Sequence, residues 1–389
     1  MFQKDEQIRQ GVSKVDNNAN RCNRCILPES FPGLTFDESG ICNKCREHAR
    51  KWGNLDFEKS EKALRSIFET AKRKKGEYDC IVGLSGGKDS SYVVYLCVKE
   101  YGLNPLCVTF DNGFLSTEAS ENIRRLVEKL NVAHILNEPD WELMKRLYRH
   151  FLLTAGEVCT PCNVGINSLL YNMANKYRVP MIISGYSAYT DSEPDNNIYH
   201  VSTEYFENVV KGHFTKNELE DFLHSRMLAR GMYHLTGKIK HIQMPRYVKW
   251  DEREIISVLN REIGWEVDSA VSTSQPIEHT DCIAACLKQY LRIKKYGFSE
   301  NTQKFSALIR NGFMTREEAL AKAESLESGI EEDKSGRIPR LMQMLDLSME
   351  DLAEAVKKRQ GPYIPKSTKL VDKFIIRNEL LMRKLVYRY

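Results

Sequence analysis

The residues most suited to chemistry lie between Asp79 and Leu96, where DCIVGLSGGKDSSYVVYL joins an apolar strand to a helix. Gly86 and Gly87 let the backbone turn tightly and bring its N–H groups close to a ligand. The helix that starts near Asp89 points its positive N-terminal end at the same place. Further donors at this turn are the side chains of Ser85, Lys88, Ser90 and Ser91. The turn therefore predicts a site for a pyrophosphate group, although a purely structural glycine-rich turn is the alternative.

The spacing fits neither the Walker A pattern nor the dinucleotide fingerprint. Instead, SGGKDSS resembles the PP-loop signature S-G-G-x-D-S of the ATP pyrophosphatase superfamily. These enzymes cleave ATP between the α and β phosphates and transfer AMP to a substrate oxygen. The resemblance implies that the β- and γ-phosphates of ATP are held by Ser85, Gly86, Gly87, Asp89, Ser90 and Ser91. It further implies Mg²⁺ near Asp89, with Lys88, Asp89 and Ser90 as the catalytic residues.

Two more strand ends suit the same nucleotide. Asp111 ends the apolar segment PLCVTFD, and Asn112 follows it within the TFDNGF motif, where relatives bind adenosine. Gly185 follows VPMIIS, where relatives carry a loop that closes on the nucleotide, and Ser184 and Asp191 are further candidates there. Each position is also consistent with an ordinary loop.

The N-terminal region predicts a metal site. Cys22, Cys25, Cys42 and Cys45 form two C-x-x-C pairs, which supply four thiolates for a closed tetrahedral zinc site. A segment this short obtains most of its folding energy from the metal. Because no coordination position stays open, we expect a structural zinc, with a rubredoxin-like iron as the alternative.

A second cysteine set begins with Cys159 and Cys162 in EVCTPCNVG. Such a pair could be redox-active or half of a metal site. In one branch of the PP-loop superfamily, which includes tRNA thiolation enzymes, a similar pair and one later cysteine hold a [4Fe–4S] cluster. By this resemblance the third ligand is Cys282, with Cys286 as the alternative. A second zinc, or reduced thiols that only pack, are the other readings.

The elements that position these residues indicate an α/β fold. Apolar segments at 79–85, 105–111, 133–137 and 179–185 read as buried strands, and 238–244 as a further strand. Helical periods lie between them, which predicts a parallel sheet covered on both faces. We expect a zinc module over residues 1–55, a PP-loop (HUP-like) domain over 56–265 and a helical region over 266–389.

Composition narrows the classes of function. The chain has 389 residues, 42% of them apolar, and a net charge of only +4, which does not indicate a nucleic-acid binder. No apolar run approaches the ~20 residues that span a bilayer, and the polar segment MFQKDEQIRQ resembles no signal peptide. Eleven cysteines without such a signal suit a reducing compartment, so we expect a cytoplasmic protein that does not bind membranes.

Several motifs together resemble the N-acetyl sugar amidotransferases of surface-polysaccharide and flagellin-glycan biosynthesis. They are the two N-terminal C-x-x-C pairs (the knuckles), GLSGGKDSSY, CTPCNVGI, the WDEREII and IGW segment, and YLRIKKYGFS with RNGFMTREEA. The resemblance implies that ATP adenylylates the acetamido oxygen of a sugar and that ammonia then replaces it, giving an acetamidino sugar. It also implies a separate glutaminase subunit as the ammonia source.

Two rival interpretations remain open. A tRNA-thiolating enzyme would share the PP-loop, the zinc and the cluster, but it would need a broad basic surface. The marked basic stretch is 357–389, which its apolar spacing makes more typical of a docking helix. A zinc-ribbon adaptor with an inactive nucleotide fold is the second rival, and the intact SGGKDSS argues against it.

Overall fold

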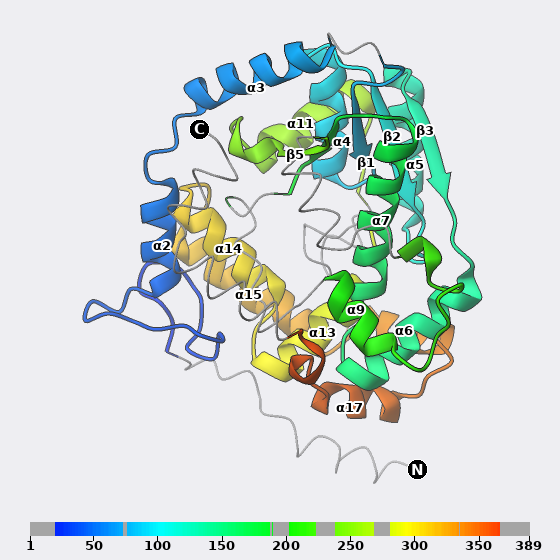
Figure 1. Cartoon of the computed structure of the whole chain (residues 1–389). Helices are drawn as coiled ribbons and strands as arrows, with labels where there is room; N and C mark the ends of the chain where they lie inside the picture. Colours follow the sequence, from blue (N-terminus) through cyan, green and yellow to red (C-terminus); the bar gives the residue numbers. More distant parts are fainter. Residues whose placement is uncertain are drawn as a thin grey trace.

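The computed structural model describes residues 20–72, 76–186, 189, 202–222, 238–267, 281–333 and 335–365. Its centre is a sheet of five parallel strands in the order β3-β2-β1-β4-β5 (Figure 1). The strands are β1 (Cys80–Gly83), β2 (Pro105–Phe110), β3 (Ala133–Asn137), β4 (Met181–Ser184) and β5 (Lys240–Gln243). The predicted fold class, a PP-loop parallel sheet with an N-terminal cysteine module and a helical C-terminal region, is therefore confirmed.

Helices separate the strands between β1 and β5, and part of them pack on the two faces of the sheet. They are α4 (Lys88–Tyr95), which continues as the π-helix η1 (Leu96–Glu100), α5 (Thr117–Leu130), α6 (Trp141–Ala155), α7 (Thr160–Lys176), α9 (Thr203–Val210) and the short η2 (Glu220–Phe222). Val82 and Ile183 point into a core shared with α4, α5, α11 (Glu252–Ile263) and α3 (Phe57–Lys72). Ile81 and Ile182 point the opposite way, into a core shared with α7. The alternation along each strand thus produces two buried faces.

One of the predicted buried strands differs from the expectation. The side chains of β3 are only partly buried, and Leu136 is 49% exposed. The reason is its position, because β3 lies at the edge of the sheet and pairs with β2 alone. An apolar run cannot distinguish a central strand from an edge strand.

The C-terminal helices build a second core. They are α13 (Ala285–Tyr296), α14 (Glu300–Arg310), α15 (Arg316–Glu331), α16 (Arg337–Met344) and α17 (Met349–Lys357), followed by the short 3-10 turn η4 (Gly361–Tyr363), whereas the 3-10 turn η3 (Met244–Arg246) directly follows β5. Helices α13, α16 and α17 pack on α6 and α9, so Phe151 and Leu287 share one apolar cluster. Thr315 and Ser348 cap α15 and α17, and Ser348 forms the full capping box with Asp351. The proposed domain limits stay predictions.

The cysteine module packs on this helical region. Its helix α2 (Asn43–Trp52) runs beside α14 and α15 in Figure 1, and α2 contacts α14. Phe31 stacks on Phe298 at a centroid distance of 5.3 Å, and Ile26 enters an apolar cluster with Phe305. Among the helices of the described ranges, none is both long and apolar enough to cross a bilayer.

Candidate active site

The glycine turn lies where the strand order changes direction. From β1 the chain continues to β2 and β3 on one side of the sheet, whereas β4 and β5 lie on the other. Parallel sheets bind ligands at such a switch point, beyond the carboxyl ends of the strands. Gly86 has φ +77°, and a Cβ there would collide with the carbonyl oxygen of Ala119 at the start of α5. Only glycine fits this position.

The turn presents donors at the beginning of α4. Gly87 is the N-cap of α4 and provides no side-chain cap, so the first N–H groups of the helix are not blocked by a capping side chain. Ser90 Oγ lies 3.1 Å from Ser85 Oγ and donates to the carbonyl oxygen of Gly87 at 3.1 Å. Ser91 Oγ is buried and has no hydrogen-bond partner in the part of the chain that the structure describes. This combination can accept an anion with several oxygen atoms.

A tryptophan and an asparagine hold the turn in place. The Nε1–H of Trp265 and the Nδ2–H of Asn122 both donate to the carbonyl oxygen of Gly86, at 2.8 and 3.3 Å. Asn122 is itself fixed, because its Oδ1 accepts the backbone N–H of Glu266 at 3.0 Å. Two side-chain donors thereby engage the carbonyl oxygen of Gly86. In the sequence, Trp265 stands in the IGW motif without any sign of this role, and nothing points to Asn122.

A buried charge network lies next to the turn. The Asp89 carboxylate receives the Lys88 ammonium at 2.9 Å and the Nε1–H of Trp250 at 2.8 Å. Glu252 Oε1 lies 3.7 Å from Lys88 Nζ and 2.9 Å from Lys304 Nζ. Burial alone would raise the pKa of Asp89, but the Lys88 and Lys304 charges and the Trp250 hydrogen bond lower it below its ordinary value. Asp89 is therefore held as an anion.

Other predicted site residues lie around this network. Lys88 is 3% exposed and ion-paired, so its charge acts on the turn through Asp89 in this structure. Gly185 approaches Asp89 so closely that a Cβ on Gly185 would lie 2.9 Å from the Asp89 carbonyl oxygen. Asp191 lies outside the described residues. The individual roles given to these residues stay predictions.

The second strand end reaches toward the cysteines. Asp111 Oδ1 accepts the N–H of Gly113 at 2.9 Å, which shapes the turn after β2. The Nδ2 of Asn112 lies 3.2 Å from Cys162 Sγ and 3.9 Å from Cys282 Sγ. The sulfur atoms of Cys162 and Cys282 therefore lie beside the same amide group. In this structure the amide of Asn112 contacts sulfur, and its predicted role toward adenosine stays untested.

The structure brings Cys282 to the side of the C-x-x-C pair. The backbone of Cys282 forms an isolated antiparallel β-bridge with Leu115, and Cys159 is the N-cap of α7. Burial raises the pKa of Cys159, Cys162 and Cys282 to about 12 each. Three buried thiols with such pKa values become thiolates only when a cation is present. This donor set fits an iron–sulfur cluster with one iron open, although its sulfurs are too widely spaced for a single ion.

Cys286, the alternative ligand, lies apart from this set. Cys286 follows Cys282 by four residues, and its Sγ donates to the carbonyl oxygen of Ile283 at 3.3 Å. Burial, together with the nearby Asp333 charge, raises the pKa of Cys286 to about 11. The placement thus favours Cys282 over Cys286 as the companion of Cys159 and Cys162.

The N-terminal cysteines form a compact group of buried sulfurs. All four sulfur atoms lie within 4.8 Å of one another, and the Cys22–Cys45 and Cys25–Cys42 distances are 3.9 and 3.8 Å. A tetrahedron of sulfurs about 2.3 Å from a central ion has edges of about 3.8 Å, so the group fits one zinc or iron ion. Within the described ranges this is the sole such cluster of metal-ligating side chains.

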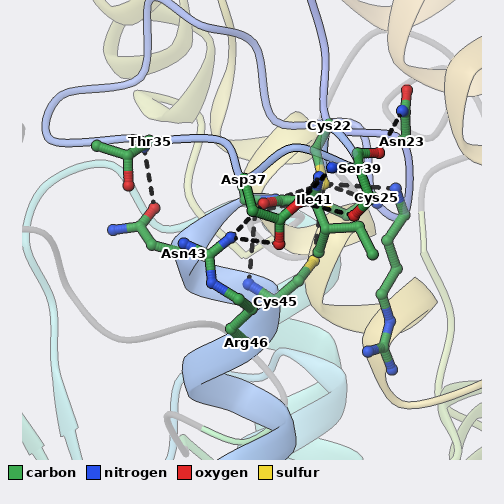
Figure 2. A network of polar contacts seen from close by, with 12 residues as sticks. Cys22, Asn23, Cys25, Thr35, Asp37, Ser39, Ile41, Asn43, Cys45 and Arg46 are labelled. Atoms are coloured by element: carbon green, nitrogen blue, oxygen red, sulfur yellow. Dashed lines mark hydrogen bonds and ion pairs between the residues drawn. The ribbon is translucent and has the colours of Figure 1, made fainter.

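The surrounding chain pre-forms this metal site. Figure 2 shows Asp37 accepting hydrogen bonds from Ser39, Ile41 and Arg46, which close the loop between the two knuckles. The backbone N–H of Cys42 donates to Cys22 Sγ at 3.2 Å. Hydrogen bonds from the other thiols lower the pKa of Cys22, and the same contacts raise the pKa of Cys45. Four sulfurs in mutual contact cannot all be charged unless a cation lies among them.

Several basic side chains of the helical region have mostly structural contacts. Arg316 donates to the carbonyl oxygens of Cys22 and Cys25, and Lys294 pairs with Glu331 at 2.6 Å. Arg292 and Lys295 line a cavity of about 30 Å³, and Cys159 is also part of its lining. The end of the basic stretch, 366–389, lies outside the described residues.

Two family models match separate parts of the chain. Residues 58–184 match the NAD synthase family, and residues 276–375 match the C-terminal domain of LPS biosynthesis protein WbpG-like sequences. The chain joins a PP-loop domain to a WbpG-like C-terminal domain. It is accordingly of the ATP pyrophosphatase type, and its C-terminal part is of the type found in lipopolysaccharide biosynthesis. Lys304 and Asp281 belong to the WbpG-like part, although both lie beside the PP-loop.

Individual relatives are distant. An uncharacterized protein of Methanocaldococcus jannaschii is 22% identical over 305 residues, which cover 78% of this chain and 93% of that protein. The glutamine-hydrolyzing GMP synthase of Wigglesworthia glossinidia brevipalpis is 29% identical over 119 residues. The match covers 30% of this chain and 22% of that enzyme.

Similar solved structures include NMN synthetase from Francisella tularensis, at 14% identity and a TM-score of 0.36. That match covers 73% of this chain and 96% of the synthetase. The U34-tRNA thiolase NcsA of Methanococcus maripaludis, with its [4Fe–4S] cluster, has 16% identity and a TM-score of 0.32. It covers 75% of this chain and 86% of the thiolase.

Proposed function

We propose that the chain is a cytoplasmic, ATP-dependent N-acetyl sugar amidotransferase. It adenylylates the amide oxygen of an acetamido sugar and replaces that oxygen with ammonia, releasing AMP and pyrophosphate. The observation that carries the proposal is the meeting of the SGGKDSS turn with residues of the WbpG-like domain, Lys304 through Glu252 and Asp281 beside Gly87. These contacts support a joint role of the turn, which matches the NAD synthase family, and the WbpG-like domain.

The chemistry follows from the stability of an amide. Its oxygen is a poor leaving group, so it first attacks the α-phosphorus of ATP, and pyrophosphate departs with the electrons of the broken P–O bond. The amide nitrogen loses a proton, which leaves a neutral adenylyl imidate. Ammonia adds to the activated carbon, and AMP leaves with the former amide oxygen. The product is the amidine.

Each part of the turn has a task in this sequence. The N–H groups of Gly86 and Gly87 and the hydroxyls of Ser85, Ser90 and Ser91 bind the β- and γ-phosphates. We assign Mg²⁺ to Asp89, whose carboxylate Lys88 and Trp250 hold as an anion. When bound, Mg²⁺ neutralises charge on the phosphates. Asp111, Asn112 and Gly185, at the neighbouring strand ends, are assigned to the nucleoside side.

The remaining parts are structural or come from outside. Zinc in the Cys22–Cys45 site stabilises the N-terminal module, since four protein ligands leave no position for substrate. Ammonia is mostly protonated at neutral pH, so we propose that a separate glutaminase subunit delivers it. The described helices offer no membrane span, and we assign the protein no membrane or nucleic-acid partner.

Isotope transfer tests the reaction directly. The enzyme is incubated with ATP, ammonium and a panel of acetamido sugars whose amide oxygen is ¹⁸O. We expect ¹⁸O in AMP, release of pyrophosphate, and a sugar whose mass has changed by replacement of oxygen with an N–H group. Release of ADP and phosphate, or ¹⁸O retained in the sugar, contradicts the proposal.

Variants connect the reaction to the turn. Asp89→Asn and Ser90→Ala should each lower pyrophosphate release by about 10²-fold or more, because both act on the charged phosphates. Exposed residues of the same types, Asp221→Asn and Ser335→Ala, serve as controls with unchanged rates. Normal activity of the Asp89 and Ser90 variants excludes this turn as the active site.

A second candidate function is tRNA thiolation with an iron–sulfur cluster. The specific observation in its favour is the approach of Cys282 to the Cys159–Cys162 pair, which suits a cluster with one open iron. Binding of tRNA that weakens steeply with salt, together with sulfur transfer and no reaction on acetamido sugars, would favour this candidate.

A further inference from the structure

A carboxylate from the WbpG-like domain faces the phosphate turn. A Cβ placed on Gly87 would lie 3.4 Å from both Cγ and Oδ2 of Asp281, and 3.4 Å from Ser85 Oγ. The carboxylate of Asp281 and the hydroxyl of Ser85 therefore converge over the same backbone position. Oδ1 of Asp281 is buried and has no hydrogen-bond partner within the described ranges.

The backbone fixes Asp281 in this place. Its carbonyl oxygen accepts the N–H of Ser116 at 3.0 Å, and the next residue pairs with Leu115 in an antiparallel bridge. The N–H of Ile283 donates to the carbonyl oxygen of Phe114 at 2.8 Å. The segment is thus joined to the start of α5, against which the glycine turn also rests. Asp281 is therefore a built part of the site.

The negative charge of Asp281 does not suit a phosphate site at this turn unless a further group is present. N–H groups and hydroxyls around Gly87 attract anions, and a carboxylate at the same position repels a phosphate. The ammonium group nearest to the turn, Lys88, is already paired with Asp89 and Glu252. In the described part of the chain no Lys, Arg or His pairs with Asp281. A cation between the carboxylate and the phosphates removes the conflict.

We propose that Asp281 is a ligand of the divalent cation that binds together with ATP. The cation site is then shared between the PP-loop domain, through the phosphate turn, and the WbpG-like domain, through Asp281. Carboxylate and phosphate oxygens are the ligands that Mg²⁺ prefers. The inference rests on the ATP-binding part of the proposed function and is independent of the sugar.

Metal and nucleotide binding test the proposal without turnover. Mn²⁺ replaces Mg²⁺ and is followed by electron paramagnetic resonance in the presence of α,β-methylene-ATP, which the enzyme cannot cleave between those phosphates. Asp281→Asn should weaken Mn²⁺ binding in the nucleotide complex about tenfold or more, because a charged ligand is lost. In EDTA the same variant should bind the free nucleotide as well as the wild type or more tightly, because repulsion is removed. These opposite signs identify a cation ligand.

Other outcomes overturn the proposal in distinguishable ways. Equal weakening with and without metal means that Asp281 only shapes the turn. Unchanged Mn²⁺ binding with a raised KM for ammonium means that the carboxylate binds the ammonium ion instead.

Asp221→Asn is the matched exposed control, and iron content verifies that Cys282 is undisturbed. Asp281→Ser provides a second variant if the asparagine protein does not fold. A wild type that binds no nucleotide at all refutes the ATP site itself and, with it, the proposed function.

Discussion

The indole N–H of Trp265 donates to the carbonyl oxygen of Gly86 across 179 positions of the chain, at 2.8 Å. Trp265 follows helix α11, whereas Gly86 lies in the glycine turn before α4. The hydrogen bond fixes the peptide between Gly86 and Gly87, whose N–H group faces the opposite way from its carbonyl. The conformation of the turn therefore depends on a residue from outside its own βα unit.

Removal of this hydrogen bond should weaken ATP binding. In Trp265→Phe the buried ring is mostly kept, but the carbonyl of Gly86 loses its stronger donor, a net loss of about 0.5–1.5 kcal/mol. We expect ATP affinity to fall about 2- to 10-fold with little change in the thermal midpoint. Isothermal titration with α,β-methylene-ATP measures it, and Trp52→Phe in the zinc module is the control. Equal affinities of the two variants would refute the positioning role.

The buried pair of Lys304 and Glu252 should matter more for stability than a surface pair. Lys304 is 3% exposed, and its loss in Lys304→Met leaves Glu252 without its closest cation. Breaking such a buried pair costs about 3–5 kcal/mol of unfolding free energy. Lys357→Met, which breaks an exposed pair with Glu354, should cost about 0–1 kcal/mol.

A double-mutant cycle separates this pairing from packing. If the ion pair matters, Lys304→Met combined with Glu252→Gln should cost less than the sum of the two single changes in urea unfolding. Strict additivity would mean that the two side chains act independently.

The N-terminal cysteines should bind one zinc ion per chain. Cys22→Ser should lose that zinc and unfold the module, because the metal supplies most of its folding energy. Plasma emission spectrometry measures the stoichiometry, and proteolysis detects the unfolded segment. Cys97→Ser, a buried cysteine of the sheet domain, should keep the zinc. A Cys22 variant with full zinc content would refute the assigned ligand set.

The second cysteine set should distinguish Cys282 from Cys286. Purified without oxygen, the protein should carry about four irons and a brown colour. Cys282→Ala should lose both, whereas Cys286→Ala should keep them, because Cys286 lies apart from the other thiols. A colourless wild type without iron would remove the cluster, and loss of iron only in the Cys286 variant would reverse the assignment.

His48 should make the fold sensitive to acid. Burial and then the Arg310 charge lower the pKa of His48 to about 4 in the folded chain, against about 6.5 when unfolded. Between these values the unfolded chain binds a proton that the folded chain does not, so stability falls as pH drops from about 6.5 to 4. His48→Phe keeps the stacking on Tyr189 and should flatten this dependence.

Urea titrations at several pH values measure the effect of His48. The exposed His213→Phe provides the control and should leave the slope unchanged. An identical slope in the wild type and the His48 variant would show that other groups cause the acid sensitivity.

The sequence by itself determined the features that arise from neighbouring residues. Two glycines between a strand and a helix are enough to predict the phosphate turn, and two C-x-x-C pairs are enough to predict the sulfur tetrahedron, because both depend on local spacing. The strands were recognised from their apolar runs, and the parallel sheet was confirmed. The exposed edge strand β3 was wrongly expected to be buried, since a run of apolar residues contains no information on its neighbours.

Only the tertiary structure decided which distant side chains complete the site. The contacts of Trp265 with Gly86, Lys304 with Glu252, and Asp281 with the turn join segments that no periodicity relates. The same holds for the placement of Cys282 rather than Cys286 near Cys162. Periodicity sets the face of an element on which a side chain lies. The packing of that element against others sets which group the side chain meets, and that depends on the whole folded chain.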